Sequence, residues 1–457
     1  MSAITDNTTI AAISTPPGTG GISVIRISGE NAVEIADKVF SSKSLKTAKS
    51  HTVHYGFIKD KNGETIDEVL LSVMLAPKTF TREDTVEISC HGGSVSTHAV
   101  LRAIIEAGAH MAGPGEFTKR AFMNGRIDLS QAEAVIDIIN SKNELAQRNA
   151  ISQLGGSLSK EIESVRDELV HLSARMQVII DYPDEDLEDV DSTDIDNICG
   201  ACAEKIKQLI DSSDSGRMMR DGIRAAIVGK PNVGKSSILN CLAKEDRAIV
   251  TEIAGTTRDV IEESVTVKGI PLILSDTAGI RDTDDVVEKI GVEKSKQYLG
   301  SADLVIVVLD SAMPLDDNDR EVLSATENKK RIILLNKSDI GAVLTESDCP
   351  KNCDVIEISA KTGEGVAEFA KAIEKICKID GIESENGRII TNMRHKTALM
   401  GAYEALVRVC DALKMGMPSD IVSIDIAAAM DSLGQITGQT VSDSVVDDIF
   451  HNFCVGK

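Results

Sequence analysis

Residues 229–237 (GKPNVGKSS) carry the clearest chemistry in the sequence, because their spacing matches the phosphate-binding pattern G-x-x-x-x-G-K-[ST]. The glycines of such a loop let backbone N–H groups close on a phosphate chain, assisted by the positive end of the following helix. We expect Lys235 to reach the β- and γ-phosphates of a nucleotide and Ser236 to ligate Mg²⁺. A chance glycine turn before a helix is the alternative for this motif taken alone.

Three further motifs favour GTP. At Asp276–Gly279 (DTAG), a carboxylate can hold the Mg²⁺ shell and the glycine N–H can meet the γ-phosphate. In Asn336–Asp339 (NKSD), Asp339 can accept both the N1–H and the 2-amino group of guanine, a pair of donors that adenine lacks. Ser359–Lys361 (SAK) suits a backbone N–H donated to guanine O6. Each motif alone is weak, but four in this order predict a GTP-binding domain.

Each motif follows a run that is apolar enough for a buried strand. These runs cover 223–228, 270–274, 331–335 and 355–358, and the most apolar run covers 302–310. The phosphate loop is followed by apolar residues at helical spacing over 238–243. A strand, a glycine loop and a helix form the context that the phosphate-binding motif needs. We therefore assign residues 219–382 to a Ras-like P-loop GTPase domain.

The flanking regions predict other folds. Residues 1–118 read as a mixed α/β domain with strands at 9–14, 22–27 and 85–90. Residues 119–218 read as helical, and one apolar stripe consists of Leu158, Ile162, Val165, Leu169, Leu172, Met176 and Ile179. Residues 383–457 return to helix but make a poor core alone. Pairing them with the earlier helices would give one bundle with the GTPase domain inserted in it.

Composition limits the other classes of function. The chain has 457 residues, a net charge of −23 and a pI of about 4.8, which argues against broad electrostatic binding of nucleic acid. There is no Trp and only 3% aromatic residues, so a stacking platform for single-stranded bases is not expected. Nine scattered cysteines suit a reducing cytoplasm. No signal segment and no apolar run near 18 residues occurs, so we expect a soluble cytoplasmic protein without a membrane partner.

The GTPase motifs resemble those of the translation-factor-like GTPases, with one departure. Gly255–Asp259 (GTTRD) places Thr257 as the switch threonine that closes on Mg²⁺ and the γ-phosphate. Ile280 follows the DTAG motif where Ras-like proteins have a glutamine that orients the attacking water. Isoleucine cannot do this, so another water-positioning residue and another source of positive charge are needed.

Taken as a whole, the chain resembles the MnmE (TrmE) family of tRNA-modifying GTPases over essentially all of its length. The resemblance rests on the inserted GTPase domain and on short motifs at 15–18 (TPPG), 26–29 (RISG), 91–93 (HGG), 113–118 (GPGEFT) and 454–457 (CVGK). It implies a multidomain α/β plus all-α architecture, with an N-terminal α+β folate-binding-like domain that forms a homodimer, a central helical bundle and the inserted GTPase domain.

The resemblance also implies the reaction and its partners. The family works with an FAD- and NADH-dependent partner, MnmG (GidA), in a heterotetramer or larger complex. Together they install a carboxymethylaminomethyl or aminomethyl group on C5 of the wobble uridine (U34) of certain tRNAs. A tetrahydrofolate derivative, 5,10-methylene- or 5-formyl-tetrahydrofolate, supplies the one-carbon unit. Carried over by position, the folate contacts are Arg26, Glu87, Arg126 and Lys457.

For hydrolysis, the resemblance implies GTPase domains that dimerise and a K⁺ ion that supplies the missing charge. The implied K⁺ ligands are Asn232, Thr251, Ile253 and Thr256, and those of Mg²⁺ are Ser236 and Thr257. Glu288 matches the residue that positions the attacking water, Arg258 supports loop closure, and Cys454 lies beside the folate site, where support is favoured over direct chemistry. The catalytic set is then Glu288, Lys235, Thr257, Asp276, Arg258 and Cys454.

With the switch residues included, the chain offers a long set of nucleotide contacts. The expected GTP-binding residues are Asn232, Val233, Gly234, Lys235, Ser236, Ser237, Thr251, Glu252, Ile253, Ala254, Gly255, Thr256, Thr257, Asp276, Thr277, Ala278, Gly279, Asn336, Lys337, Ser338, Asp339, Ser359, Ala360 and Lys361.

Two other functions and the route to tRNA stay open at this point. One is a ribosome-assembly GTPase, although no second GTPase motif set and no basic RNA-binding module is found. The other is a folate-dependent transferase whose GTPase domain is regulatory. An acidic chain leaves tRNA contact unexplained, and we expect the partner to supply most of the positive surface. A local patch of Lys119, Arg120 and Arg394 would supply the rest.

Overall fold

The computed structural model describes residues 8–181, 191–245, 263–267, 270–274, 302–376 and 389–457. The chain divides into two compact units, each described separately below. Unit 1 comprises Met1–Ile136, Gln153–Val190 and Met417–Lys457, and unit 2 comprises Asp137–Ser152 and Asp191–Gly416. Both units are therefore assembled from segments that lie far apart in the sequence.

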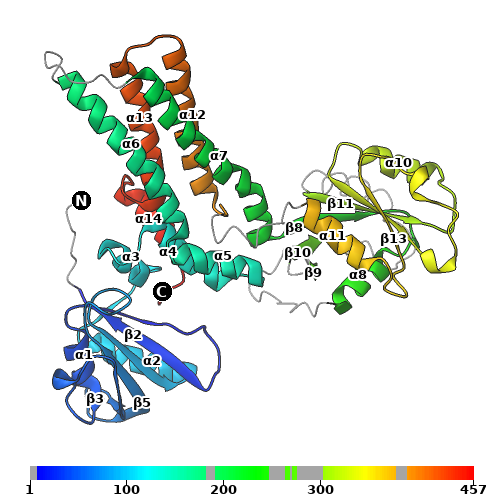
Figure 1. Cartoon of the computed structure of the whole chain (residues 1–457). Coiled ribbons are helices and arrows are strands. Elements are labelled where there is room, and N and C mark those ends of the chain that lie inside the picture. Colours follow the sequence, from blue (N-terminus) through cyan, green and yellow to red (C-terminus); the bar gives the residue numbers. More distant parts are fainter. Residues whose placement is uncertain (1–7, 182–190, 246–262, 268–269, 275–301, 377–388) are drawn as a thin grey trace. The chain divides into compact units, whose positions relative to one another are not determined.

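Unit 1 contains a seven-stranded sheet in the order β3-β4-β5-β6-β2-β1-β7, in which every neighbouring pair is antiparallel except β1 and β7. Its strands are β1 (Ile10–Ile13), β2 (Ile22–Ser28), β3 (Phe40–Ser41), β4 (Thr52–Lys59), β5 (Thr65–Met74), β6 (Thr85–His91) and β7 (His110–Met111). Helices α1 (Ala32–Val39) and α2 (Ser94–Glu106) pack their apolar residues against one face of this sheet (Figure 1). Alternate residues of each strand are therefore left on the opposite face.

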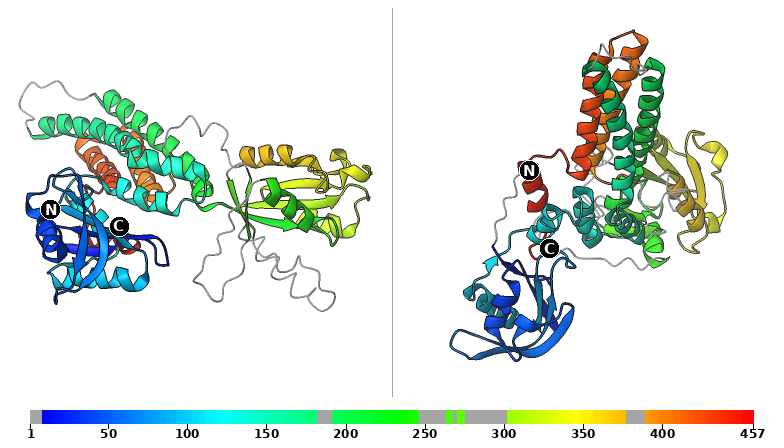
Figure 2. Two further views of the ribbon diagram at one scale, coloured as in Figure 1. Left: turned by 90° about the horizontal axis from the view of Figure 1, so that it is seen from below. Right: turned by 60° about the vertical axis from the view of Figure 1, so that its left-hand side comes forward.

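The other described elements of unit 1 are helices. They are η1 (Leu45–Thr47), α3 (Glu116–Met123), most of α4 (Leu129–Asn140), α6 (Ser157–Asp181), α13 (Ser419–Thr437) and α14 (Asp443–His451). The predicted stripe on α6 is confirmed from Leu158 to Met176, since those six side chains are at most 2% exposed. Helix α13 runs beside α6, so the late helices do pair with an early one (Figure 2).

Unit 2 contains a second sheet in the order β13-β12-β11-β8-β10-β9, parallel except for the β9–β10 pair. Its strands are β8 (Ile223–Val228), β9 (Glu263–Val267), β10 (Ile270–Leu274), β11 (Leu304–Asp310), β12 (Arg331–Asn336) and β13 (Asp354–Ile358). The helices are α5 (Glu144–Leu154), α7 (Ser192–Asp221), α8 (Lys235–Glu245), α10 (Asp317–Ala325), α11 (Val366–Ile376) and α12 (Met393–Lys414), with short turns η3 (Ser338–Ile340) and η4 (Glu346–Asp348). The strands predicted from apolar runs are thus confirmed, and they form one P-loop GTPase sheet.

Helix α7 runs directly into this sheet, because only Gly222 separates it from β8. Gly222 has a φ of 90°, which favours glycine, and an added Cβ would lie 2.9 Å from the carbonyl oxygen of Pro271. Near its end α7 also contacts the segment that enters α12, where Ser212 Oγ accepts a hydrogen bond from the backbone of Ile390 at 3.2 Å. Helices α7 and α12 lie side by side (Figure 2).

Candidate functional site

The phosphate loop lies where the sequence predicted it, between β8 and α8. Gly229 has a φ of 152°, and a Cβ there would lie 2.3 Å from the carbonyl oxygen of Val308, so only glycine allows this close approach to β11. Lys235 begins α8, and its Nζ donates to the carbonyl oxygens of Gly229 at 2.7 Å and Lys230 at 2.6 Å. Burial lowers the pKa of Lys235. The loop therefore holds an ammonium group against its own backbone, ready to exchange carbonyl oxygens for phosphate oxygens.

Asn336 joins three of the predicted motifs. Its side chain is buried, and Nδ2 donates to the Val233 carbonyl oxygen of the phosphate loop at 2.7 Å. Its Oδ1 accepts from the Ala360 backbone N–H at 3.1 Å. Gly234 has a φ of 96°, and a Cβ there would lie 2.2 Å from Asn336 Nδ2. The structure thus brings the phosphate loop, the NKSD motif and the SAK motif to one edge of the sheet.

The expected guanine-reading carboxylate is held in place by its neighbours. Asp339 follows β12 in η3, and its Oδ1 accepts from Ser359 Oγ at 2.8 Å. Lys361 Nζ lies 4.0 Å from Asp339 Oδ2. Lys337 adopts a left-handed backbone with φ 68°, and its Nζ pairs with Asp310 at 2.6 Å. This geometry leaves a positioned carboxylate beyond the carboxyl end of β12, as base recognition requires.

The remaining described contacts lie in the phosphate loop, the start of α8 and η3. Asn232 is exposed with a left-handed φ of 62°, Ser236 and Ser237 fall in the first turn of α8, and Ser338 lies in η3. The switch residues fall outside the described residues. They are Thr251, Glu252, Ile253, Ala254, Gly255, Thr256, Thr257, Arg258, Asp276, Thr277, Ala278, Gly279, Ile280 and Glu288.

A second cluster of charged side chains lies in unit 1, with Arg26 on β2 and Glu87 on β6. Arg26 and Glu87 are directly paired in the sheet register, and Arg26 Nε and Nη2 lie 2.9 and 2.8 Å from Glu87 Oε1. The Arg26 guanidinium also lies 5.9 Å from the ring centroid of Phe80 and 5.6 Å from that of Phe117. Arg126 lies over the same Phe80 ring at 4.8 Å. Three residues that the sequence placed in a folate site are thus adjacent.

Sequence reasoning missed Phe80 and Phe117, which hold this cluster together. Phe117 belongs to the GPGEFT motif, so that motif could have identified it, whereas nothing in the local pattern singles out Phe80. Phe117 is fully buried beneath Arg26, whereas the partly exposed Phe80 ring lies against both guanidinium groups and also suits the flat ring of a ligand. The cluster therefore combines a carboxylate, two arginines and aromatic surface.

The C-terminal tail docks beside the start of α3. Pro114 forms an isolated β-bridge with Val455, and the Cys454 carbonyl oxygen accepts from the Gly115 backbone N–H at 3.3 Å. Ser14 Oγ donates to the Gly456 carbonyl oxygen at 3.0 Å. Cys454 is exposed.

The terminal lysine does not join the arginine cluster directly. Within the described part of the chain, Lys457 makes no ion pair or side-chain hydrogen bond with Arg26, Glu87 or Arg126, although all four lie in unit 1. Its backbone N–H donates to the Cys454 carbonyl oxygen at 3.4 Å, so the last four residues turn back on themselves.

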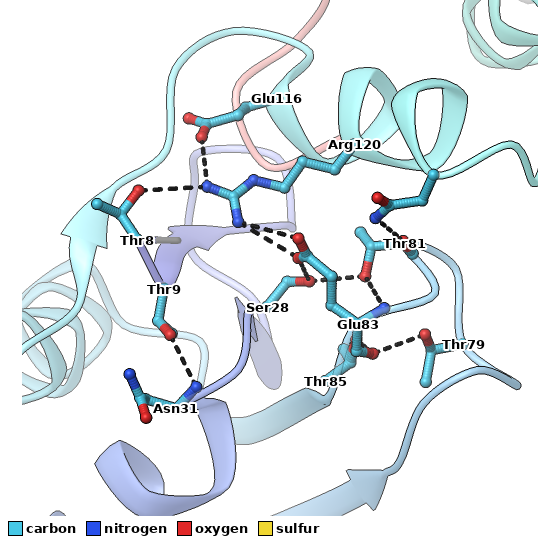
Figure 3. Close-up of polar contacts among 11 residues, drawn as sticks. Thr8, Thr9, Ser28, Asn31, Thr79, Thr81, Glu83, Thr85, Glu116 and Arg120 are labelled. Carbon is cyan, nitrogen blue, oxygen red and sulfur yellow. Dashed lines mark hydrogen bonds and ion pairs between the residues drawn. The ribbon is translucent and has the colours of Figure 1, made fainter. Parts of the chain in front are cut away.

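The basic patch suggested at Lys119, Arg120 and Arg394 is wrong for Arg120. Its side chain is 13% exposed, and it donates to Glu83 at 3.2 and 3.3 Å and to Glu116 at 2.9 Å (Figure 3). Lys119 pairs with Asp447 at 2.5 Å. Arg120 is therefore held by two carboxylates and offers little positive surface to tRNA, whereas Lys119 lies in an exposed ion pair. The Glu116 partner lies one helical turn from Arg120 and was visible in the sequence, whereas Glu83 and Asp447 are too distant in the chain for a local pattern to reveal.

The described residues contain neither a cluster of metal ligands nor a membrane-spanning helix. No group of three or more His, Cys, Asp and Glu side chains there is arranged to hold a metal ion. No helix in the described ranges combines the length and apolar character needed to cross a bilayer. Cys199 and Cys202 are buried in α7, and burial raises the pKa of Cys199 to about 12, so this thiol is unreactive.

Family models match nearly the whole chain. The model described as GTP-binding protein TrmE N-terminus matches residues 9–126, and the model described as MnmE helical domain matches residues 129–454. Two curated relatives are each named tRNA modification GTPase MnmE. That of Lactobacillus delbrueckii subsp. bulgaricus is 49% identical over 99% of both chains, and that of Clostridioides difficile is 48% identical over 98% of this chain and 99% of its own.

Among solved structures, the G domain of the T. maritima FeoB iron transporter is similar to part of this chain. It is 28% identical and covers 34% of this chain and 98% of its own length, with a TM-score of 0.26. A score this low supports no argument.

Proposed function

The chain belongs to the MnmE family of tRNA modification GTPases, and from this membership we propose that it couples GTP hydrolysis to modification of the wobble uridine. It binds GTP and is a GTP hydrolase that acts in tRNA modification. The full-length match displaces the ribosome-assembly alternative. We propose that, together with an FAD- and NADH-dependent partner protein, it adds a carboxymethylaminomethyl or aminomethyl group at C5 of U34 in certain tRNAs.

The observation that best supports the one-carbon chemistry is the cluster of Arg26, Glu87 and Arg126. Arg26 holds Glu87 in place through Oε1, so the carboxylate can accept hydrogen bonds from the amino and ring N–H groups of a pterin. Arg126 donates one N–H to the Phe80 carbonyl oxygen at 2.9 Å, and its other N–H groups can donate to ligand carboxylates. A tetrahydrofolate derivative bound there would supply the one-carbon unit. The carboxylate thus fits the pterin end of such a molecule, and the arginine fits its carboxylate end.

For the GTPase site, we propose that Lys235 and Ser236 hold the phosphates and Mg²⁺ while Asp339 reads guanine. The partly buried ammonium of Lys235 and the Asp339 carboxylate held by Ser359 fit these tasks. Mg²⁺ would neutralise developing phosphate charge. K⁺ would add the positive charge that an arginine supplies elsewhere, and the exposed Asn232 fits as one of its ligands. Thr257 and the remaining ligands proposed from the family lie outside the described residues.

Glu288 is proposed to position the attacking water, since Ile280 cannot. Glu288→Ala should leave GTP affinity near that of the unmodified protein and abolish hydrolysis, measured by phosphate release. A large loss of GTP affinity would instead make the residue structural. Hydrolysis should also be faster in K⁺ than in Na⁺ at equal ionic strength, and equal rates would remove K⁺ from the mechanism.

The proposed partners are a second copy of the chain, the FAD-dependent protein and tRNA, in the cytoplasm. The open face of β4 and β5 supports the homodimer, because Val53, Tyr55 and Leu70 are 63%, 58% and 50% exposed there. Tyr55 and Leu70 are also paired in the sheet register, so the apolar surface is continuous. The proposed domains are 1–118, 119–218, 219–382 and 383–457.

Nucleoside analysis tests the proposal as a whole. Cells that lack this chain should contain tRNA without the C5 substituent on U34, detected by mass spectrometry of digested tRNA. Restoring the chain should restore the modified nucleoside. Unchanged modification in cells without the chain would contradict the proposal.

A further inference from the structure

We propose that Arg82 and Arg126 form an anion-binding pair that holds the glutamate carboxylates of the folate, which makes the site selective for the length of the folate tail. This inference rests on the proposed folate site and adds a residue that the sequence did not suggest. Arg82 lies in the loop before β6, and Arg126 lies in the turn after α3.

Short hydrogen bonds interlock these two segments. Arg82 Nη1 donates to the Asn124 carbonyl oxygen at 2.9 Å, and Asn124 Nδ2 donates back to the Thr81 carbonyl oxygen at 2.6 Å. Arg126 Nη1 donates to the Phe80 carbonyl oxygen at 2.9 Å. Each arginine therefore donates one N–H to a backbone carbonyl oxygen, and its other guanidinium N–H groups remain available as donors. Both side chains are exposed, so those donors can reach a ligand.

Nearby carboxylates do not neutralise this pair. Glu83, next to Arg82, is turned toward Arg120 and Ser28 (Figure 3). Asp84 accepts from the Ala76 backbone N–H at 2.9 Å, and Asp128 accepts from Ser130 and Gln131. Among the described residues, neither Arg82 nor Arg126 forms an ion pair.

The two guanidinium groups lie on neighbouring segments, since Arg82 Nη1 donates to the carbonyl oxygen of Asn124, two residues before Arg126. Burial, and secondarily the charge of Arg82, lower the pKa of Arg126. Arg82 also has a left-handed φ of 59°, a conformation that costs a non-glycine residue free energy. An anion bound between the two arginines would offset this repulsion and form charge-assisted hydrogen bonds with both.

The position of the pair points to the ligand. Arg126 and Arg26 lie on the same Phe80 ring, at 4.8 and 5.9 Å from its centroid. One strip therefore runs from the Glu87 carboxylate through Arg26 and Phe80 to the Arg82–Arg126 pair. It offers a hydrogen-bond acceptor at one end and positive charge at the other. A reduced folate has the complementary polarity, with N–H donors on its pterin and carboxylates on its glutamate tail.

Binding measurements on the full-length protein test this assignment. The probes are 5-formyl-tetrahydrofolate with one glutamate, the same compound with three glutamates, and 5-formyl-tetrahydropteroate, which has none. Arg82→Gln keeps a donor for the Asn124 carbonyl oxygen but removes the charge. We expect it to weaken triglutamate binding about tenfold and to change pteroate binding less than about twofold. Arg82→Lys should recover most of the loss, and Arg102→Gln, an exposed arginine on α2, is the matched control.

Several results would overturn the inference. Equal weakening of all three ligands by Arg82→Gln would mean that the residue only supports the loop, and no weakening would mean that it does not touch the tail. Unchanged folate binding with a salt-dependent loss of tRNA affinity would assign the pair to RNA phosphates. If the unmodified protein binds none of the probes, the folate proposal itself fails, a result distinct from the others.

Discussion

Replacing Asp339 by Asn tests base recognition with a nearly isosteric change. The Asp339 carboxylate is 18% exposed, and Ser359, whose side chain is fully buried, donates to its Oδ1 at 2.8 Å. An asparagine can keep this bond through its own Oδ1. The substitution therefore removes the charge and one acceptor facing the base without removing the contact that positions the side chain.

The expected loss follows from the one hydrogen bond to guanine that the new amide cannot accept. A hydrogen bond to a charged group contributes about 1.5–3 kcal/mol. That range corresponds to a GTP affinity roughly 10- to 10²-fold lower. Xanthine carries a carbonyl oxygen where guanine carries the 2-amino group, and it can accept from the new amide. XTP should therefore bind the Asp339→Asn protein more tightly than GTP does.

Titration of fluorescent GTP and XTP measures both effects, with Asp354→Asn as the control. Asp354→Asn also removes a paired carboxylate, but its partner at 2.9 Å is the exposed Lys375, so little change in nucleotide affinity is expected. A GTP affinity within about threefold of the unmodified protein in Asp339→Asn would refute the assignment. So would an equal loss for GTP and XTP, because it would indicate a disrupted loop and not a changed base contact.

Two further predictions concern folding. Gly216→Ala should destabilise unit 2 by about 1–3 kcal/mol, because its Cβ would lie 2.1 Å from the Ile390 carbonyl oxygen. Gly200→Ala, on the same helix, meets nothing within 4 Å and should stabilise the protein by about 0.5–1 kcal/mol. The two substitutions should shift the thermal midpoint in opposite directions, and equal shifts would contradict this reasoning. The hydrogen bond to Asp67 raises the pKa of His91, so this pair stabilises fully below the unfolded pKa of about 6.5, and its contribution is lost as pH rises through the higher folded pKa. The difference in thermal midpoint between the unmodified protein and His91→Gln should shrink over that interval, and a constant difference would assign the effect to packing.

Strands and helices with strong apolar patterns could be predicted from the sequence. The P-loop sheet and the α6 stripe were found because buried strands and a long packed helix have distinct periods. The β4–β5 hairpin was missed, although Asn62-Gly63 between two alternating runs is a hairpin signal. Its open face exposes Val53 and Tyr55, which weakens the inward–outward contrast.

Site residues were predictable where a motif carries its own chemistry. The phosphate loop and NKSD motif are local patterns, so the positions of Lys235 and Asp339 followed directly from the sequence. Arg82 and Arg120 differ in whether a carboxylate pairs with them, and this depends on a residue that is distant in sequence from one of them. Glu83 pairs with Arg120 and not with Arg82, its neighbour in the chain. Such pairings depend on how loops meet in three dimensions, which no local pattern records.

The central claim is that a folate-type cluster and a GTPase site in one chain serve a single tRNA modification. Its most direct test is nucleoside mass spectrometry of tRNA from cells that carry only Glu87→Gln or only Asp339→Asn in place of the unmodified chain. We predict that each substitution alone strongly reduces the C5-modified wobble uridine, while Asp354→Asn leaves it unchanged. Normal levels of the modified nucleoside in either of the first two strains, with the variant protein present at normal abundance, would contradict the claim.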